Sequence, residues 1–68
     1  MNTLYEIGAL VIVYDPYDHK DIICVVVGIA TIEAVEETED ILYRGYCLSY
    51  NSPYYFFDSD VVCRIEDH

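Results

Sequence analysis

The sequence predicts an all-β domain whose five short strands form a small, partly open barrel. Apolar runs rich in valine, isoleucine, tyrosine and phenylalanine alternate with short polar breaks, which is the pattern of strands joined by tight turns. No apolar stripe with helical spacing is sustained along the chain. Residues 1–68 are interpreted as one domain, near the lower size limit for folding without disulfides or metals.

The stretch from Ile41 to Ile65 organises the predicted fold. The triplet Asn51-Ser52-Pro53 favours turn dihedrals, so the runs on either side of it, Ile41–Tyr50 and Tyr54–Phe57, are expected to form a hairpin. The short polar break at residues 58–60 suits a single tight turn that carries Val61–Ile65 to another edge of the sheet.

Two strands are expected upstream of this hairpin. Ala9–Tyr14 is the first, and the Asp-Pro pair that follows it predicts a loop over Asp15–Lys20. Asp21–Ile32 is long for one strand, and Gly28 inside it predicts a bulge or sharp bend, so a strongly curved strand is expected. A helix competes only over Thr31–Tyr43, where the apolar stripe is not continued.

Three short motifs resemble small SH3-like barrels: Gly8-x-x-Val11-x-Val13, Tyr43-x-Gly45-x-Cys47, and Tyr55-x-Phe57-x-x-Asp60-Val61-x-x-x-Ile65. The resemblance implies a five-stranded, partly open barrel with a long curved second strand and a 3-10 turn before the last strand. It implies a fold and no function, because small barrels of this kind host many roles. The sequence departs from the family at Gly45, where a branched apolar residue is usual, and in lacking the basic residues of nucleic-acid-binding members.

The net charge of −10 restricts the partners of the chain. Nucleic acids and anionic membranes would be repelled, so no direct nucleic-acid or membrane binding is expected, and basic protein surfaces become the natural partners. Met1–Glu6 lacks the basic start of a signal peptide, and the longest apolar run is too short to span a membrane. A cytoplasmic location is expected.

The polar and sulfur-containing side chains predict no enzyme, no cofactor and no metal. The three cysteines have no C-x-x-C spacing and are expected to be buried, reduced thiols; a disulfide or zinc site is the alternative. The Asp15-x-x-Asp18-His19-x-Asp21 pattern matches no calcium loop and is interpreted as a polar turn. Arg44 and Arg64 are expected to pair with neighbouring acids.

The apolar residues outnumber the positions that a small barrel can bury. The expected core comprises Val11, Val13, Val25, Val27, Ile29, Tyr43, Cys47, Tyr55, Phe57, Val61 and Ile65. A second set, predicted to form a dimer or partner interface, comprises Leu10, Ile12, Tyr14, Tyr46, Leu48, Tyr50, Tyr54 and Phe56. A homodimer and a different partner protein are both compatible with this surface, and so is coverage by the chain itself.

The acidic residues predicted to meet a partner are Glu33, Glu36, Glu37, Glu39, Asp40, Asp58 and Asp60. Such a run is either a solvated loop that keeps the domain soluble or a display of carboxylates that imitates a phosphate track. The leading hypothesis is a small acidic inhibitor that blocks a basic, nucleic-acid-handling protein by charge mimicry, similar in type to bacteriophage host-takeover and anti-defence proteins. The alternative is a non-inhibitory structural or adaptor barrel that dimerises or joins a larger assembly.

Overall fold

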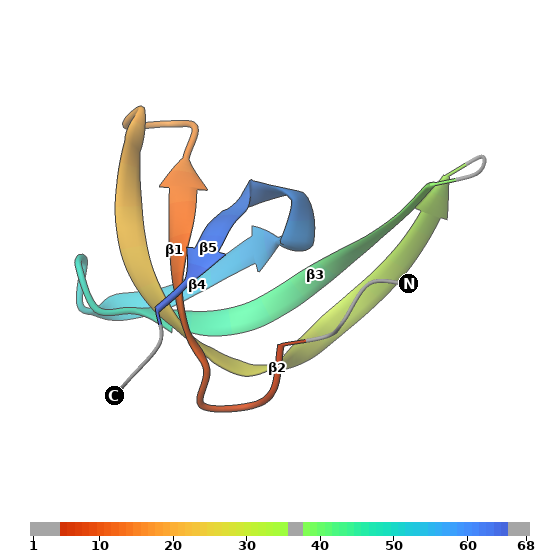
Figure 1. The fold of residues 1–68 in the computed structure, drawn as a ribbon, viewed down its shortest axis with the longest axis horizontal. Coiled ribbons are helices and arrows are strands. Elements are labelled where there is room, and N and C mark those ends of the chain that lie inside the picture. The colour runs from red at the N-terminus through yellow and green to blue at the C-terminus, as the bar shows by residue number, and fades with distance from the viewer. Residues whose placement is uncertain (1–4, 36–37, 66–68) are drawn as a thin grey trace.

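The computed structural model describes the backbone of residues 5–35 and 38–65 and the side chains of residues 5–31 and 40–65. Its elements are β1 (Leu10–Asp15), β2 (Lys20–Val35), β3 (Thr38–Cys47), β4 (Ser52–Phe57), the 3-10 turn η1 (Asp58–Asp60) and β5 (Val61–Arg64). The strands form one antiparallel sheet of order β4-β3-β2-β1-β5 that coils without closing (Figure 1). The predicted five-stranded, partly open barrel with a turn before its last strand is confirmed. No helix in the described part of the chain could cross a membrane.

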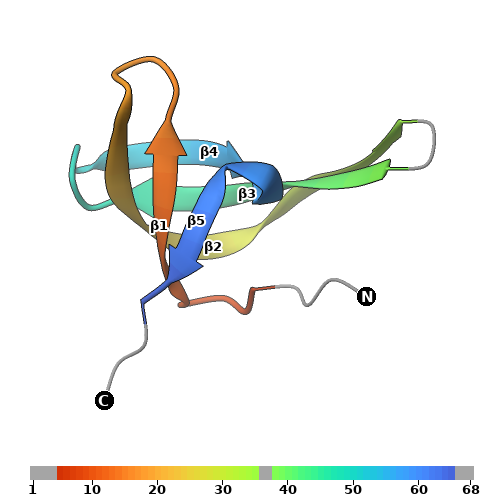
Figure 2. The ribbon, with the colours of Figure 1, turned by 45° about the horizontal axis from the view of Figure 1, so that its top comes forward.

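The long strand β2 curves through the whole molecule. Its pairing with β3 shifts register between Val26 and Gly28 and again between Ile29 and Thr31, and such bulges bend a strand and increase its twist. The bend predicted at Gly28 is therefore confirmed. Beyond the second shift, β2 and β3 leave the barrel as a projecting two-stranded ribbon (Figure 2). The helix considered for Thr31–Tyr43 is wrong wherever this stretch is described, because strand pairing satisfies its backbone.

The β3–β4 turn lies earlier than predicted. It spans residues 48–51 and ends at Asn51, which adopts a left-handed φ of 54°, a conformation that asparagine tolerates well. Pro53 belongs to β4, opposite Tyr46. Proline is tolerated there because β4 is an edge strand of the sheet. The predicted tight turn at residues 58–60 is confirmed, since η1 carries β5 to the free edge of β1.

The core comprises Ala9, Val11, Val13, Ile22, Cys24, Val26, Ile41, Tyr43, Cys47 and Phe56. The predicted core faces of β1 and β3 are correct, whereas those of β2 and β4 are wrong by one residue. Val27, Ile29 and Tyr55 are 44%, 42% and 54% exposed. Val11 pairs with Cys24 and Tyr43 pairs with Phe56, and paired residues share a face, so these registers turn Cys24 and Phe56 inward.

Gly45 allows the largest rings of the core to meet. A Cβ at this position would lie 2.6 Å from a ring carbon of Phe56 and 2.9 Å from the carbonyl oxygen of Val25. Phe56 therefore occupies the space that a branched residue at Gly45 would fill. Its ring stacks on Tyr43 with a centroid distance of 5.6 Å, and Tyr5 meets the same tyrosine edge-on at 5.8 Å.

The cysteines are free thiols, as predicted, but they are not all buried. Cys24 and Cys47 face each other across β2 and β3 in the core, while Cys63 on β5 is exposed, so the prediction is wrong for Cys63. Burial raises the pKa of the Cys24 thiol to about 12, with a smaller contribution from Cys47. Cys24 is therefore protonated at neutral pH and a poor nucleophile.

Candidate functional site: an acidic groove lined by tyrosines

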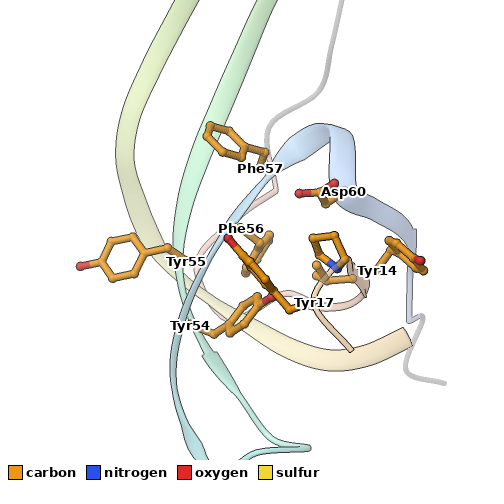
Figure 3. Close-up of a pocket in the computed structure, with 9 residues that line it drawn as sticks. Tyr14, Tyr17, Tyr54, Tyr55, Phe56, Phe57 and Asp60 are labelled. Atoms are coloured by element: carbon orange, nitrogen blue, oxygen red, sulfur yellow. The ribbon is translucent and has the colours of Figure 1, made fainter. Parts of the chain in front are cut away.

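A groove of about 200 Å³ lies between the β1–β2 loop and the β4–η1 segment. This volume is below the range typical of small-molecule pockets. Its lining comprises Val13, Tyr14, Pro16, Tyr17, Tyr54, Tyr55, Phe56, Phe57 and Asp60 (Figure 3).

The floor and the walls of the groove have different exposures. Val13 and Phe56 form a rigid floor because both are core residues, with 0% and 2% exposure. Tyr17 in the loop is 86% exposed, and Tyr14 at the end of β1 is 38% exposed. The ring of Tyr55 points away from the groove toward the other face of the sheet (Figure 3). The walls of the groove are therefore aromatic and accessible to solvent.

The alternation of β4 sets which tyrosine enters the groove. Tyr54 pairs with Gly45 and shares the inward face of Phe56, whereas Tyr55 pairs with the exposed Arg44. Tyr50, from the β3–β4 turn, lies beside Tyr54, with ring centroids 6.3 Å apart. Burial raises the pKa of Tyr54 to about 12, and Asp15 adds to this shift. The Tyr54 hydroxyl is thus protonated at neutral pH and remains a hydrogen-bond donor.

Asp15 holds the loop that carries Tyr17. Asp15 is 2% exposed, and its carboxylate accepts hydrogen bonds from the backbone N–H groups of Tyr17 (2.9 Å) and Asp18 (3.4 Å). The hydroxyl of Tyr50 donates to Asp15 Oδ2 at 2.5 Å and lies 3.0 Å from Asp18 Oδ2. The Tyr50 hydrogen bond, followed by the backbone N–H groups, lowers the pKa of Asp15 against the opposing effect of burial. The two carboxylates raise the pKa of Tyr50.

Two carboxylates place negative charge beside this groove. Asp60 lies at its rim, and Asp15 and Asp60 both act electrostatically on Tyr54. One cation lies close to the same loop, Lys20, whose Nζ is 5.0 Å from the centroid of the Tyr50 ring. A cationic side chain entering the groove would meet the Asp60 carboxylate at the rim and aromatic faces in the walls.

The predicted acidic residues occupy different parts of the structure. Asp60 lines the groove. Asp58 and Asp40 accept hydrogen bonds instead, Asp58 from the Tyr43 hydroxyl (3.3 Å) and Asp40 from the Ser59 hydroxyl (3.0 Å). Glu33 pairs in register with Asp40, and Glu39 pairs with Ala34, so all three acids belong to the projecting ribbon. The side chains of Glu33 and Glu39 lie outside the described residues. Glu36 and Glu37 lie outside the described residues.

The predicted aromatic and apolar surface residues also separate. Tyr14 and Tyr54 line the groove, and Tyr50 supports its loop. Tyr46 and Leu48, with Leu10 and Ile12, lie outside the core. The assignment of Phe56 to an exposed interface is wrong, because the ring is buried against Tyr43.

Sequence reasoning missed Asp15, Pro16, Tyr17 and Asp18. The signal that could have identified them is an aromatic residue between acids in a short loop that follows a buried strand, because exposed loop residues on a rigid scaffold often carry function. The same tetrapeptide was interpreted as a polar turn. The turn interpretation is correct for the backbone, since Asp15 caps two N–H groups of the loop.

The arginines behave differently from each other. Arg64 forms an ion pair with Glu6, and this contact lowers the pKa of Glu6, so the predicted pairing of Arg64 is confirmed. For Arg44 the predicted pairing is wrong, since it makes no ion pair with any described residue. Among the described side chains, no three His, Cys, Asp or Glu groups gather closely enough to hold a metal ion.

Comparisons with protein-family models, with curated proteins and with solved structures give no match to this chain.

Proposed function

We propose that this protein is a non-enzymatic binding module that captures a basic segment of a partner protein in the tyrosine-lined groove. In this proposal the partner is a nucleic-acid-handling protein, and the captured segment is one that it uses to hold phosphates. Occupation of that segment by carboxylates blocks the partner by charge mimicry. The buried, free thiols of Cys24 and Cys47 suit a reducing, cytoplasmic setting.

The observation that carries the proposal is the joining of aromatic walls to an acidic rim. Tyr14, Tyr17 and Tyr54 provide flat faces, on which the aliphatic stem of lysine or the guanidinium of arginine packs favourably. Asp60 at the rim supplies an acceptor for the charged end of such a side chain. Aromatic-lined grooves of small domains also suit extended, polyproline-type segments, which lose little entropy on binding.

The net charge of −10 supports an inhibitory role beyond simple capture. The backbone register of the projecting ribbon pairs Glu33 with Asp40, so two acidic residues stand opposite each other in the sequence of this hairpin. Long-range attraction by these acids would raise the association rate with a basic protein and weaken as salt is added.

A second candidate function is a non-inhibitory adaptor that dimerises or joins a larger assembly. The observation that favours it is the outward face of the sheet, where Ile23 and Leu48 are 39% and 52% exposed. Sedimentation at two protein concentrations separates the candidates. A dimer stable at low concentration that binds no basic protein would support the adaptor and contradict inhibition.

The site itself is tested with a blocked peptide that contains proline and two arginines, titrated into isotopically labelled protein. Amide shifts are expected at Tyr14, Tyr17 and Tyr54. Tyr17→Ala and Asp60→Asn should each weaken binding by about tenfold. Tyr55→Ala is the matched control, because its ring points away from the groove (Figure 3). Equal binding by all variants would refute the groove as the site.

The inhibitory role needs a second experiment with a partner. A basic protein retained from a bacterial lysate by the wild-type chain is purified, and its binding to labelled nucleic acid is measured with and without the inhibitor. Loss of nucleic-acid binding is expected, and Glu36→Lys with Glu37→Lys should abolish it. If the partner still binds nucleic acid while it is bound to this chain, the chain is a binding module only, and charge mimicry is refuted.

A further inference from the structure

The outward face of the central strands is apolar and carries no carboxylate at its centre. Cross-strand pairs place Val25 beside Tyr46 and Arg44 beside Tyr55, while Asp21 lies at one end of the face. We name it the Arg44 face and define it by Ile23, Val25, Val27, Arg44, Tyr46 and Tyr55. Ile23, Val27 and Tyr55 are 39%, 44% and 54% exposed. Contiguous exposed apolar surface on a small domain marks an interaction site.

Arg44 lies flat against this face. A Cβ built on Gly28 would lie 3.4 Å from Arg44 Nη2 and 3.9 Å from its Nε, so the guanidinium covers the bare backbone of Gly28. The register shift at this point leaves Val27, the residue before Gly28, without a directly paired residue on β3, and Tyr55 pairs with Arg44 from the other side. The arrangement presents a planar donor group within an apolar strip.

The other two cations of the chain are engaged. Arg64 pairs with Glu6, and the Nζ of Lys20 lies over the ring of Tyr50. Arg44, by contrast, has no hydrogen bond or ion pair with any described residue. In a chain with 13 acidic and 3 basic residues, a cation that has no acidic partner among the described residues is unexpected by composition alone. A guanidinium has five N–H donors that match a carboxylate in a bidentate geometry.

We propose that the Arg44 face docks a segment of a partner protein that carries one aspartate or glutamate among apolar side chains. The carboxylate meets Arg44, and the apolar side chains cover Val27 and Tyr55. The charge of this face is opposite to that of the groove, so the two sites select different segments. A second copy of this chain is the poorer occupant, because two molecules of net charge −10 repel each other and the face offers no central carboxylate to the Arg44 of its copy.

The test uses a short blocked peptide with a single glutamate flanked by leucine and valine, and a matched peptide with glutamine in its place. Each is titrated into labelled protein, and amide shifts are followed at Val27, Arg44 and Tyr55. The glutamate peptide is expected to bind about fivefold more tightly than the glutamine peptide, the upper range for one exposed ion pair. Arg44→Gln should erase this preference, while Arg64→Gln, which removes the same charge elsewhere, should retain it.

Three results would overturn the proposal. The first is equal affinity for the glutamate and glutamine peptides. The second is a shift pattern confined to Tyr17 and Tyr54, which would place the peptide in the groove. The third is a set of shifts at the Arg44 face that grows with protein concentration in the absence of peptide, which would identify a second copy as the occupant. The circular dichroism spectrum of each variant verifies that it is folded.

Discussion

Substitution of Gly45 by alanine tests the packing on which the groove depends. The added methyl group would lie 2.6 Å from a ring carbon of Phe56 and 2.9 Å from the carbonyl oxygen of Val25, both too close for an undisturbed structure. Neither neighbour moves freely, since the ring is buried and the oxygen belongs to the β2 backbone. Overpacking of this kind costs about 1–3 kcal/mol, against a gain of about 0.4–1 kcal/mol from the stiffer unfolded chain.

The net loss expected for Gly45→Ala is therefore about 1–2 kcal/mol, a large part of the stability of a domain of this size. For a domain of 60 to 100 residues, such a loss lowers Tm by on the order of 5–15 °C. Thermal and urea unfolding followed by tyrosine fluorescence measure the change. Gly28→Ala is the matched control, because its Cβ would contact only the end of Arg44 at 3.4 Å, and its stability should change by about 0.5 kcal/mol or less.

A double substitution separates the two contacts. Phe56→Leu removes the ring that the new methyl group would strike. The double variant should therefore lose less free energy of unfolding than the sum of the two single losses. Part of the Gly45→Ala loss should remain, since the Val25 oxygen still lies 2.9 Å from the methyl position. A Gly45→Ala protein as stable as the wild type would refute the packing argument and the position of Tyr54 that follows from it.

Three further predictions follow from the loop, the thiols and the groove wall. Tyr50→Phe removes the hydroxyl that lowers the pKa of Asp15. The ionised carboxylate stabilises the fold above its unfolded pKa of about 3.9, and this stabilisation is lost as pH falls through the lower folded pKa. The urea midpoints of the wild type and the variant should therefore differ at pH 7 and converge in acid, and a difference independent of pH would contradict this. A thiol reagent at neutral pH should modify Cys63 first and leave Cys24 untouched until the protein unfolds, as read by mass spectrometry; early labelling of Cys24 would show that its environment is open. Tyr17→Ala should leave the unfolding free energy within about 0.5 kcal/mol of wild type while weakening the basic peptide, because the ring is 86% exposed; a destabilised variant would assign Tyr17 to the core.

The number of strands and their succession along the chain could be predicted because they depend on local signals. The Asp-Pro pair after β1, Gly28 within β2 and the short polar break before β5 each mark a turn or bend by backbone chemistry alone. The turn after β3 was misplaced because Asn51 and Pro53 both favour turns. Only the structure shows that Asn51 closes the turn and Pro53 starts an edge strand.

The inward faces of β2 and β4 could not be predicted by alternation. Both strands are apolar on both sides, and a slip of one residue in register exchanges the faces without changing the pattern. The decision depends on cross-strand partners such as Val11 with Cys24, which link residues far apart in sequence. The groove was missed for the same reason, since it needs Tyr54 turned inward beside a loop that alternation cannot place.

The salt dependence of partner binding tests the central claim most directly. The affinity of the captured basic protein for the wild-type chain and for Asp60→Asn is measured by titration over a series of salt concentrations. The account predicts that the wild-type affinity falls steeply with salt and that Asp60→Asn binds more weakly with a shallower dependence. Affinity that is independent of salt and unchanged by Asp60→Asn would contradict capture through an acidic groove.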